Sequence, residues 1–304
     1  MIESRRCFIF ASTTCLQALV NSSVYFMDGT FRSCSKQFDQ LYIIHGEVQI
    51  FSSKVRLPLV YVLMPDRKTE IYDHVFKTLI DKCTELFGVR LKPSLIKIDF
   101  EQVVLKSLQK HFPESKISGC NFHFNQCLYR RIQHEGLAAE YRDNAEVQQY
   151  VRMVAALAHL PVDDVIDGWL AVMEDYPANN QKLNAWNDYF VSQWVENSNL
   201  PLSIWNVCGE EHRTNNTCEG YNNRLNRAVR TLHPNIYELI TVLQLEEAST
   251  RLTIHQTESG EPPKKRRKLY KNLNDKLAKF LVEYRQGDRP IKCYLKAVGY
   301  ILKL

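Results

Sequence analysis

The sequence of 304 residues lacks any apolar run of the roughly 18 residues that a membrane-spanning helix needs. Polar residues soon interrupt the apolar stretch from Cys7 to Phe10, which makes the start of the chain a poor signal peptide. The nine cysteines lack the dense spacing of a disulfide scaffold, and there is no internal repeat. These absences predict a globular protein of one large or two modest domains, in a reducing compartment and without a membrane partner.

The chain also has little net charge, +5 in all, so attraction to a polyanion must come from local clusters. One cluster stands out because five cations follow Pro262 and Pro263 without a break. They are Lys264, Lys265, Arg266, Arg267 and Lys268. A contiguous basic run in a linker predicts a nuclear import signal, with nucleic-acid contact or a solvated loop as alternatives. We therefore expect the protein in the nucleus.

Aromatic and β-branched residues predict three strands, at residues 24–31, 40–50 and 56–64, whose short connections favour antiparallel neighbours. Helical spacing of apolar residues follows over 69–87. Short strands and helices then alternate over residues 95–99, 101–112, 116–124 and 125–135. This order predicts an α/β fold with a mixed five-stranded sheet covered by helices, in which the first and fourth strands can lie side by side.

After residue 135 the pattern is almost wholly helical. Trp186, Phe190 and Trp194 lie four residues apart in a helix expected from Gln181 to Glu196, and such a stripe is typical of core packing. We expect a core at residues 1–135, a helical insertion at 136–212, the last core helices at 213–256, a basic linker at 257–268 and a C-terminal helical segment at 269–304.

Two acids interrupt otherwise apolar strands, Asp28 in the first and Asp99 at the end of the fourth. A lone aspartate at a strand end is most often a cap or turn residue. Two such acids on neighbouring strands favour a functional role, because a buried carboxylate is costly unless a metal or a cation satisfies it. With a third acid they would suit two Mg²⁺ or Mn²⁺ ions about 3.5–4 Å apart, which cut and rejoin phosphodiesters.

Three blocks of this sequence, in order across about residues 5–230, resemble the Mutator-like (MULE) transposase domain. The first block is residues 24–31 followed by 40–46. The second combines residues 99–101 with 119–124 and Gln126. The third is residues 213–226, where Thr214, Asn215 and Asn216 are N-cap candidates for a helix running to about Arg230.

The resemblance implies an RNase H-like fold interrupted by an all-helical insertion, and a DDE triad of Asp28, Asp99 and Glu219. These three acids would be both the catalytic residues and the ligands of two Mg²⁺ or Mn²⁺ ions. Residues around Glu219 would face the DNA backbone, where phosphate contacts position a duplex without reading its sequence. They are Arg213, Asn216, Asn222, Asn223 and Arg224.

The family's Cys-x-x-His signature falls on Cys120 and His123. With Cys208 and His212 these residues could form a tetrahedral zinc site. The separation between the two pairs is long, so we expect hydrogen-bonded, half-buried roles and no zinc.

The first functional hypothesis is a DDE transposase that acts on transposon terminal repeats and target DNA as a homo-oligomer, at least a dimer. The second is a domesticated or truncated DNA-binding or regulatory protein without catalysis. The presence of all three acids favours the first. Family members often carry an N-terminal zinc-containing DNA-binding module, which we expect to be absent because the chain begins just before the first block; this favours the second. A third reading, in which the acids are structural caps, does not account for three ordered blocks.

Overall fold

The computed structural model describes residues 6–51, 53–177, 180–229, 231–260 and 268–302. Most of the basic run, Lys264 to Arg267, lies outside these residues. Helices in the described part of the chain are all too short or too polar to cross a membrane. The chain divides into two compact units. The first comprises Met1–Ile117 and Asn215–Lys264, and the second comprises Ser118–Thr214 and Lys265–Leu304.

The first unit is built on a mixed sheet with the strand order β1-β4-β3-β2-β5-β6. Antiparallel pairs join β2 to β3 and β3 to β4, whereas β5 pairs with β2 in parallel. The strands are β1 (Phe8–Phe10), β2 (Ser22–Thr30), β3 (Gln40–Ile50), β4 (Ser53–Met64), β5 (Leu95–Ile98) and β6 (Lys116–Gly119). The mixed α/β sheet and the pairing of the first and fourth expected strands are confirmed. The expected count of five strands is wrong because β1, only three residues long, adds to the edge of β4.

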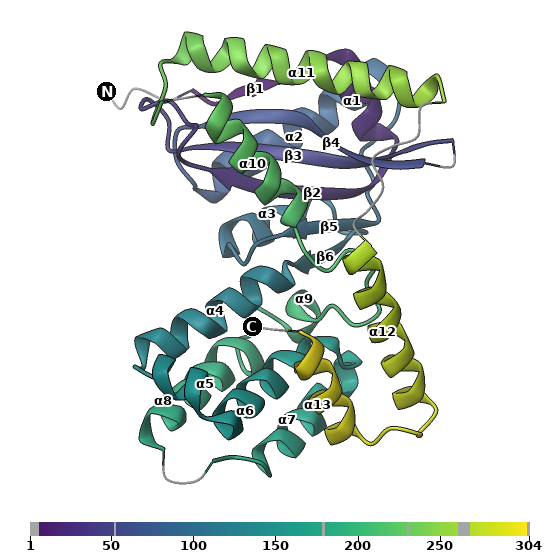
Figure 1. Ribbon diagram of the computed structural model, residues 1–304. Coiled ribbons are helices and arrows are strands. Elements are labelled where there is room, and N and C mark those ends of the chain that lie inside the picture. Colours follow the sequence, from purple (N-terminus) through teal and green to yellow (C-terminus); the bar gives the residue numbers. More distant parts are fainter. Residues whose placement is uncertain (1–5, 52, 178–179, 230, 261–267, 303–304) are drawn as a thin grey trace. The chain divides into compact units, whose positions relative to one another are not determined.

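Helices cover both faces of this sheet (Figure 1). On one face, α10 (Asn216–Ala228) and α11 (Ile236–Glu258) pack on β3 and β4. The buried residues where these helices meet the sheet form a hydrophobic cluster that contains Leu41, Ile43, Tyr61, Leu63, Tyr221, Leu225, Leu239 and Leu243. Side chains alternate along a strand, so Tyr42 points to the other face, where its ring lies 5.3 Å from that of Tyr72 in α2 (Thr69–Phe87). Two shorter helices, α1 (Thr13–Val20) and α3 (Gln102–His111), complete the unit.

The second unit is helical. Its helices are α4 (Asn121–His134), α5 (Ala138–Asp143), α6 (Ala145–Ala156), α7 (Val165–Met173), α8 (Gln181–Phe190), α9 (Leu202–Trp205), α12 (Lys268–Arg285) and α13 (Ile291–Ile301), with 3-10 turns at Leu157–His159 and Val162–Asp164. The expected tryptophan stripe is confirmed as core, because Trp186, Phe190 and Trp194 are all buried. The α-helix itself ends at Phe190, and a π-helical turn, Val191–Val195, carries Trp194.

One expected strand is shorter than its residues suggested. Residues 116–124 were expected to be extended, but β6 ends at Gly119 and α4 begins at Asn121. The reason is a helical stripe in which Phe124, Leu128 and Ile132 recur every four residues and are all fully buried. Burying this stripe requires Phe124 to lie in the helix rather than in the strand.

Candidate functional site

The parallel pairing of β2 with β5 brings Asp28 and Asp99 to the same part of the sheet. The pairs are Val24 with Leu95, Tyr25 with Ile96 and Phe26 with Lys97. Continued by two residues, this register sets Asp28 beside Asp99, which directly follows β5. The sheet therefore aligns two carboxylates that are far apart in the sequence.

Helix α10 carries Glu219 to this place. The Asn222 side chain donates a hydrogen bond from Nδ2 to Asp28 Oδ2 at 2.8 Å. At the start of the helix, Asn215 Nδ2 donates to the Met27 carbonyl oxygen at 3.1 Å. Glu219 precedes Asn222 by three residues and is half-buried, so both side chains lie on the same side of α10. The third acid is therefore on the helix face that contacts Asp28.

Several acids near the ends of β2 and β5 raise the pKa of one buried side chain, Tyr42. Burial raises the pKa of Tyr42 well above its usual value, and the charges of Tyr72, Asp99, Glu101 and Asp28 add to this effect. Asp28, Asp99 and Glu101 are therefore all close enough to this phenol for their charges to affect its pKa.

Glu101 is a fourth acid of this region, and the sequence did not single it out as a site residue. Burial raises the pKa of Glu101, and the nearby charge of Asp99 raises it further. Tyr72 donates its hydroxyl hydrogen to Glu101 Oε2 at 3.2 Å, and Gln40 Nε2 donates to the Tyr72 hydroxyl at 2.6 Å. The sequence feature that could have identified Glu101 as a site residue is its position in the second family block, two residues after Asp99.

The donor set fits hard divalent cations, because carboxylate oxygens are the ligands that Mg²⁺ and Mn²⁺ prefer. Among the described residues, no three ligand atoms that all lie within 4.8 Å of one another include both Asp28 and Asp99. Two ions about 3.5–4 Å apart, each with metal–oxygen bonds of about 2.1 Å, leave their outer ligands about 8 Å apart. Acids that hold such a pair of ions therefore need not all lie within 4.8 Å of one another.

Two buried side chains shape the charge around the acids. Lys97 is fully buried, and it lies two residues before Asp99 on the same side of β5. His45 is buried against α10, with Nδ1 3.3 Å from Cys218 Sγ, and burial lowers its pKa to about 3. The imidazole is therefore neutral at pH 7, and Lys97 is the basic residue nearest to Asp99 in the sequence. In the sequence, Lys97 could have been recognised as unusual because it is a single lysine between Ile96 and Ile98 in an apolar strand.

The five expected DNA contacts have different environments. Arg224 binds Glu246 through both terminal nitrogens, with Nη1 2.7 Å from Oε1, and Asn222 is engaged with Asp28. In the second unit, Arg213 Nη2 donates to Asn274 Oδ1 at 2.6 Å. Asn216 is half-buried at the first position of α10, and Asn223 is exposed.

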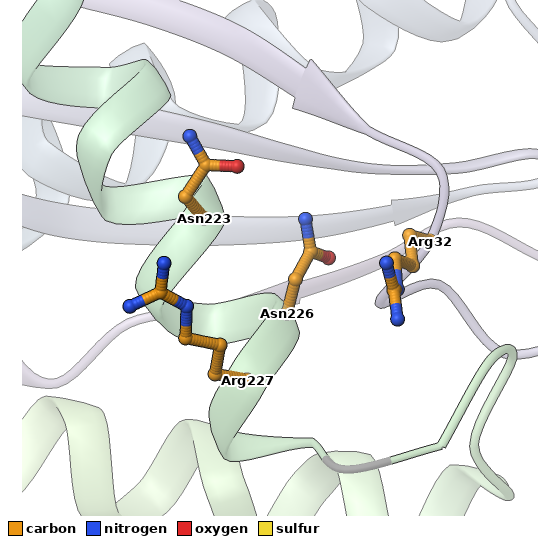
Figure 2. A pocket seen from close by; sticks show the side chains of 4 residues that line it. All are labelled: Arg32, Asn223, Asn226 and Arg227. Atoms are coloured by element: carbon orange, nitrogen blue, oxygen red, sulfur yellow. The ribbon is translucent and has the colours of Figure 1, made fainter.

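Asn223 lines a pocket of about 410 Å³ together with Arg32, Asn226 and Arg227. Figure 2 shows the two asparagines and Arg227 on the C-terminal half of α10, with Arg32 across from them on the segment that follows β2. The lining is polar and cationic, and it contains no acid. Three of its four residues were not singled out from the sequence.

The signature residues Cys120 and His123 lie at the start of α4, with Cys120 buried and His123 half-buried. Cys208 is half-buried and His212 is buried in the same unit. Within the described ranges, no group of three or more possible metal ligands joins the first pair to Cys208 or His212.

Comparison with known proteins gives one family. A search of curated proteins finds no match to this chain. The family model of the MULE transposase domain matches residues 24–127, a range that includes Asp28, Asp99, Cys120 and His123 and ends before α10. The resemblance of the first two sequence blocks is thus confirmed, because residues 24–127 of this chain match the MULE transposase domain, whereas the third block, residues 213–226, lies outside the matched range.

Proposed function

We propose that this chain is the catalytic core of a DDE-type DNA transposase, which cleaves DNA at transposon ends and joins it to target DNA. The observation that carries the proposal is the hydrogen bond from Asn222 to Asp28, at 2.8 Å. It ties the helix of Glu219 to a strand whose register aligns Asp28 with Asp99. The order of strands, an antiparallel meander followed by a parallel strand beside its first member, supports an RNase H-like fold.

In this proposal Asp28, Asp99 and Glu219 hold two Mg²⁺ or Mn²⁺ ions. Such ions polarise a phosphodiester and activate an attacking water or DNA 3′-hydroxyl when bound. Asn222 fixes the orientation of the Asp28 carboxylate through its hydrogen bond. The buried Lys97 offsets part of the negative charge that three or four acids concentrate at one sheet edge.

Replacing Asp99 with asparagine tests the proposal, because the variant keeps the shape of the side chain but loses the charge that a divalent ion needs. We expect Mg²⁺- or Mn²⁺-dependent nicking of supercoiled DNA to fall by at least about 100-fold, more than the loss typical of a residue that only supports a metal ligand. Asp81→Asn is a matched control, because Asp81 is exposed on α2 and pairs with Lys77. Nicking by Asp99→Asn at the rate of Asp81→Asn would refute the assignment.

The alternative is DNA binding without catalysis. The cationic pocket beside α10 favours it. A protein of this kind binds DNA equally with and without divalent ions and nicks no substrate. Nicking that requires Mg²⁺ or Mn²⁺ and disappears in Asp99→Asn would reject this alternative.

The remaining assignments are parts of the same proposal: transposon ends and target DNA as partners, a homo-oligomer as the working form, and the nucleus as the location. Replacement of the run from Lys264 to Lys268 by alanine should move a tagged protein out of the nucleus. An unchanged distribution would reject the import role. Elemental analysis of the purified protein would show whether zinc accompanies Cys120 and His123.

A further inference from the structure

A polar stripe runs along α10 from the third acid toward the end of the helix. Glu219, Asn223 and Arg227 are spaced four residues apart, and Asn226 lies beside Arg227. Residues at this spacing share one side of a helix. The core side of the same helix carries Cys218, Tyr221 and Leu225, which are buried. The stripe is therefore a continuous polar path that begins at Glu219.

The end of β2 and the segment after it follow the same path. Asn222 binds Asp28 at 2.8 Å, and further along the helix Asn226 accepts a hydrogen bond from the buried hydroxyl of Ser33. These two hydrogen bonds hold α10 alongside β2 and the segment that follows it. Arg32 precedes Ser33, and its position across the pocket from Asn226 is thereby fixed (Figure 2).

The two arginines of the pocket are available to a ligand. Arg32 and Arg227 are exposed, and neither pairs with an acid among the residues that the structure describes. Arg224, one turn earlier in α10, differs because Glu246 neutralises it. The C-terminus of α10 adds about half a negative charge, which two guanidinium groups exceed. The pocket therefore attracts anions.

The distance from the acids to the pocket matches a short stretch of DNA strand. Eight residues of α-helix separate Glu219 from Arg227, which is about 12 Å at about 1.5 Å per residue. Arg32 lies four residues after Asp28, in the turn that follows the end of β2 at Thr30, so it is at most about 13 Å from Asp28 at about 3.3 Å per residue. One DNA strand advances about 3.4 Å along the helix axis per nucleotide. The length of α10 between Glu219 and Arg227 therefore corresponds to about three to four nucleotides.

We propose that the pocket of Arg32, Asn223, Asn226 and Arg227 binds a backbone phosphate of DNA, about three to four nucleotides from the bond that the acids cleave. The inference rests on the proposed function and extends it to the position of the DNA strand. Guanidinium groups bind phosphate through paired charge-assisted hydrogen bonds, and asparagine amides donate to phosphate oxygens. The pocket sets the register of the strand and does not read bases.

The salt dependence of DNA binding tests this inference in the full chain. Binding of a 30-base-pair duplex is measured between 50 and 200 mM salt, with Ca²⁺ present so that cleavage does not interfere. Each phosphate contact contributes about 0.9 to the slope of log affinity against log salt, or about threefold to fourfold in affinity over this range. We expect Arg32→Gln/Arg227→Gln to lower the slope by about 0.9, because both arginines contact the same phosphate, and Arg227→Gln alone to lower it by up to that amount. Arg251→Gln, on α11 and paired with Glu247, makes the same change of net charge and should leave the slope unchanged.

The outcomes separate the pocket from the activity. If the wild type binds DNA and Arg32→Gln/Arg227→Gln keeps the full slope, or if Arg251→Gln lowers it equally, the inference fails while the proposed function stands. If the wild type binds no DNA, the proposed function fails first. A slope that falls for an RNA duplex of the same sequence and not for DNA would also overturn the inference.

Discussion

Arg224 holds the Glu246 carboxylate through two nitrogens, and its replacement by glutamine should destabilise the first unit without weakening the contact with DNA. The Glu246 side chain is only 9% exposed, whereas that of Arg224 is 57% exposed. The guanidinium also lies over the Tyr221 ring, 4.9 Å from its centroid. Removing the arginine leaves a nearly buried carboxylate without its counter-charge.

The magnitude follows from this unequal burial. Breaking a fully buried pair costs about 3–5 kcal/mol, and an exposed pair contributes about 0.2–1 kcal/mol. One partner here is buried and the other half-exposed, so we expect Arg224→Gln to lower the free energy of unfolding by about 1–2 kcal/mol. For a unit of this size the thermal midpoint should fall by about 2–8 °C, which calorimetry or circular dichroism measures.

A double-mutant cycle controls this prediction. Arg224→Gln/Glu246→Gln should be more stable than Arg224→Gln alone, because it leaves no buried charge. The salt slope of DNA binding should stay at the wild-type value. A variant with an unchanged thermal midpoint and a lower salt slope would refute the reasoning, and would mean that Arg224 serves DNA rather than Glu246.

Three further results are expected. Asn222→Ala removes the donor to Asp28, so nicking should fall about 10–100-fold and require more Mg²⁺, as a Mg²⁺ titration would show; an unchanged titration would exclude the orienting role. The folded-state pKa of His45, about 3, lies below its ordinary 6.5, so protons bind the unfolded chain first and stability falls as the pH drops from 6.5 towards 3. Denaturant unfolding at several pH values should show a steeper loss in the wild type than in His45→Gln, by up to about 1.4 kcal/mol per pH unit; equal pH slopes would contradict it. A neutral methylphosphonate three or four nucleotides from the nicked bond should weaken binding by the wild type but not by Arg227→Gln, and loss only at other positions would refute the assigned distance.

The sequence predicted most of the sheet because its strands carry strong local signals. Residues 24–31 and 40–50 are rich in aromatic and β-branched side chains, and short connections limited their pairing. Placing Asp99 beside Asp28 needed only the rule for crossover connections. The edge strand Phe8–Phe10 was missed because three residues give no periodicity.

The site was only partly predictable, because partners far apart in the chain leave no local trace. Arg224 and Asn223 are adjacent, yet one binds Glu246 on the next helix and the other lines a pocket. Neither the pairing with Glu246 nor the approach of Arg32 follows from residue type or spacing. Both depend on how α10 and α11 pack on the sheet, which is a tertiary property.

One segment of the second unit, Ser118–Thr214, precedes α10 in the sequence, and this order also bears on synthesis. Asp99 and Glu219 are separated by 219 − 99 = 120 positions in the sequence. At about 5–20 residues per second, a ribosome needs about 6–24 seconds to make that stretch. During this interval α10 and α11 have not yet been synthesised, so they cannot cover the sheet face that bears Ile43 and Tyr61. The nascent chain therefore exposes an apolar surface until these last core helices emerge.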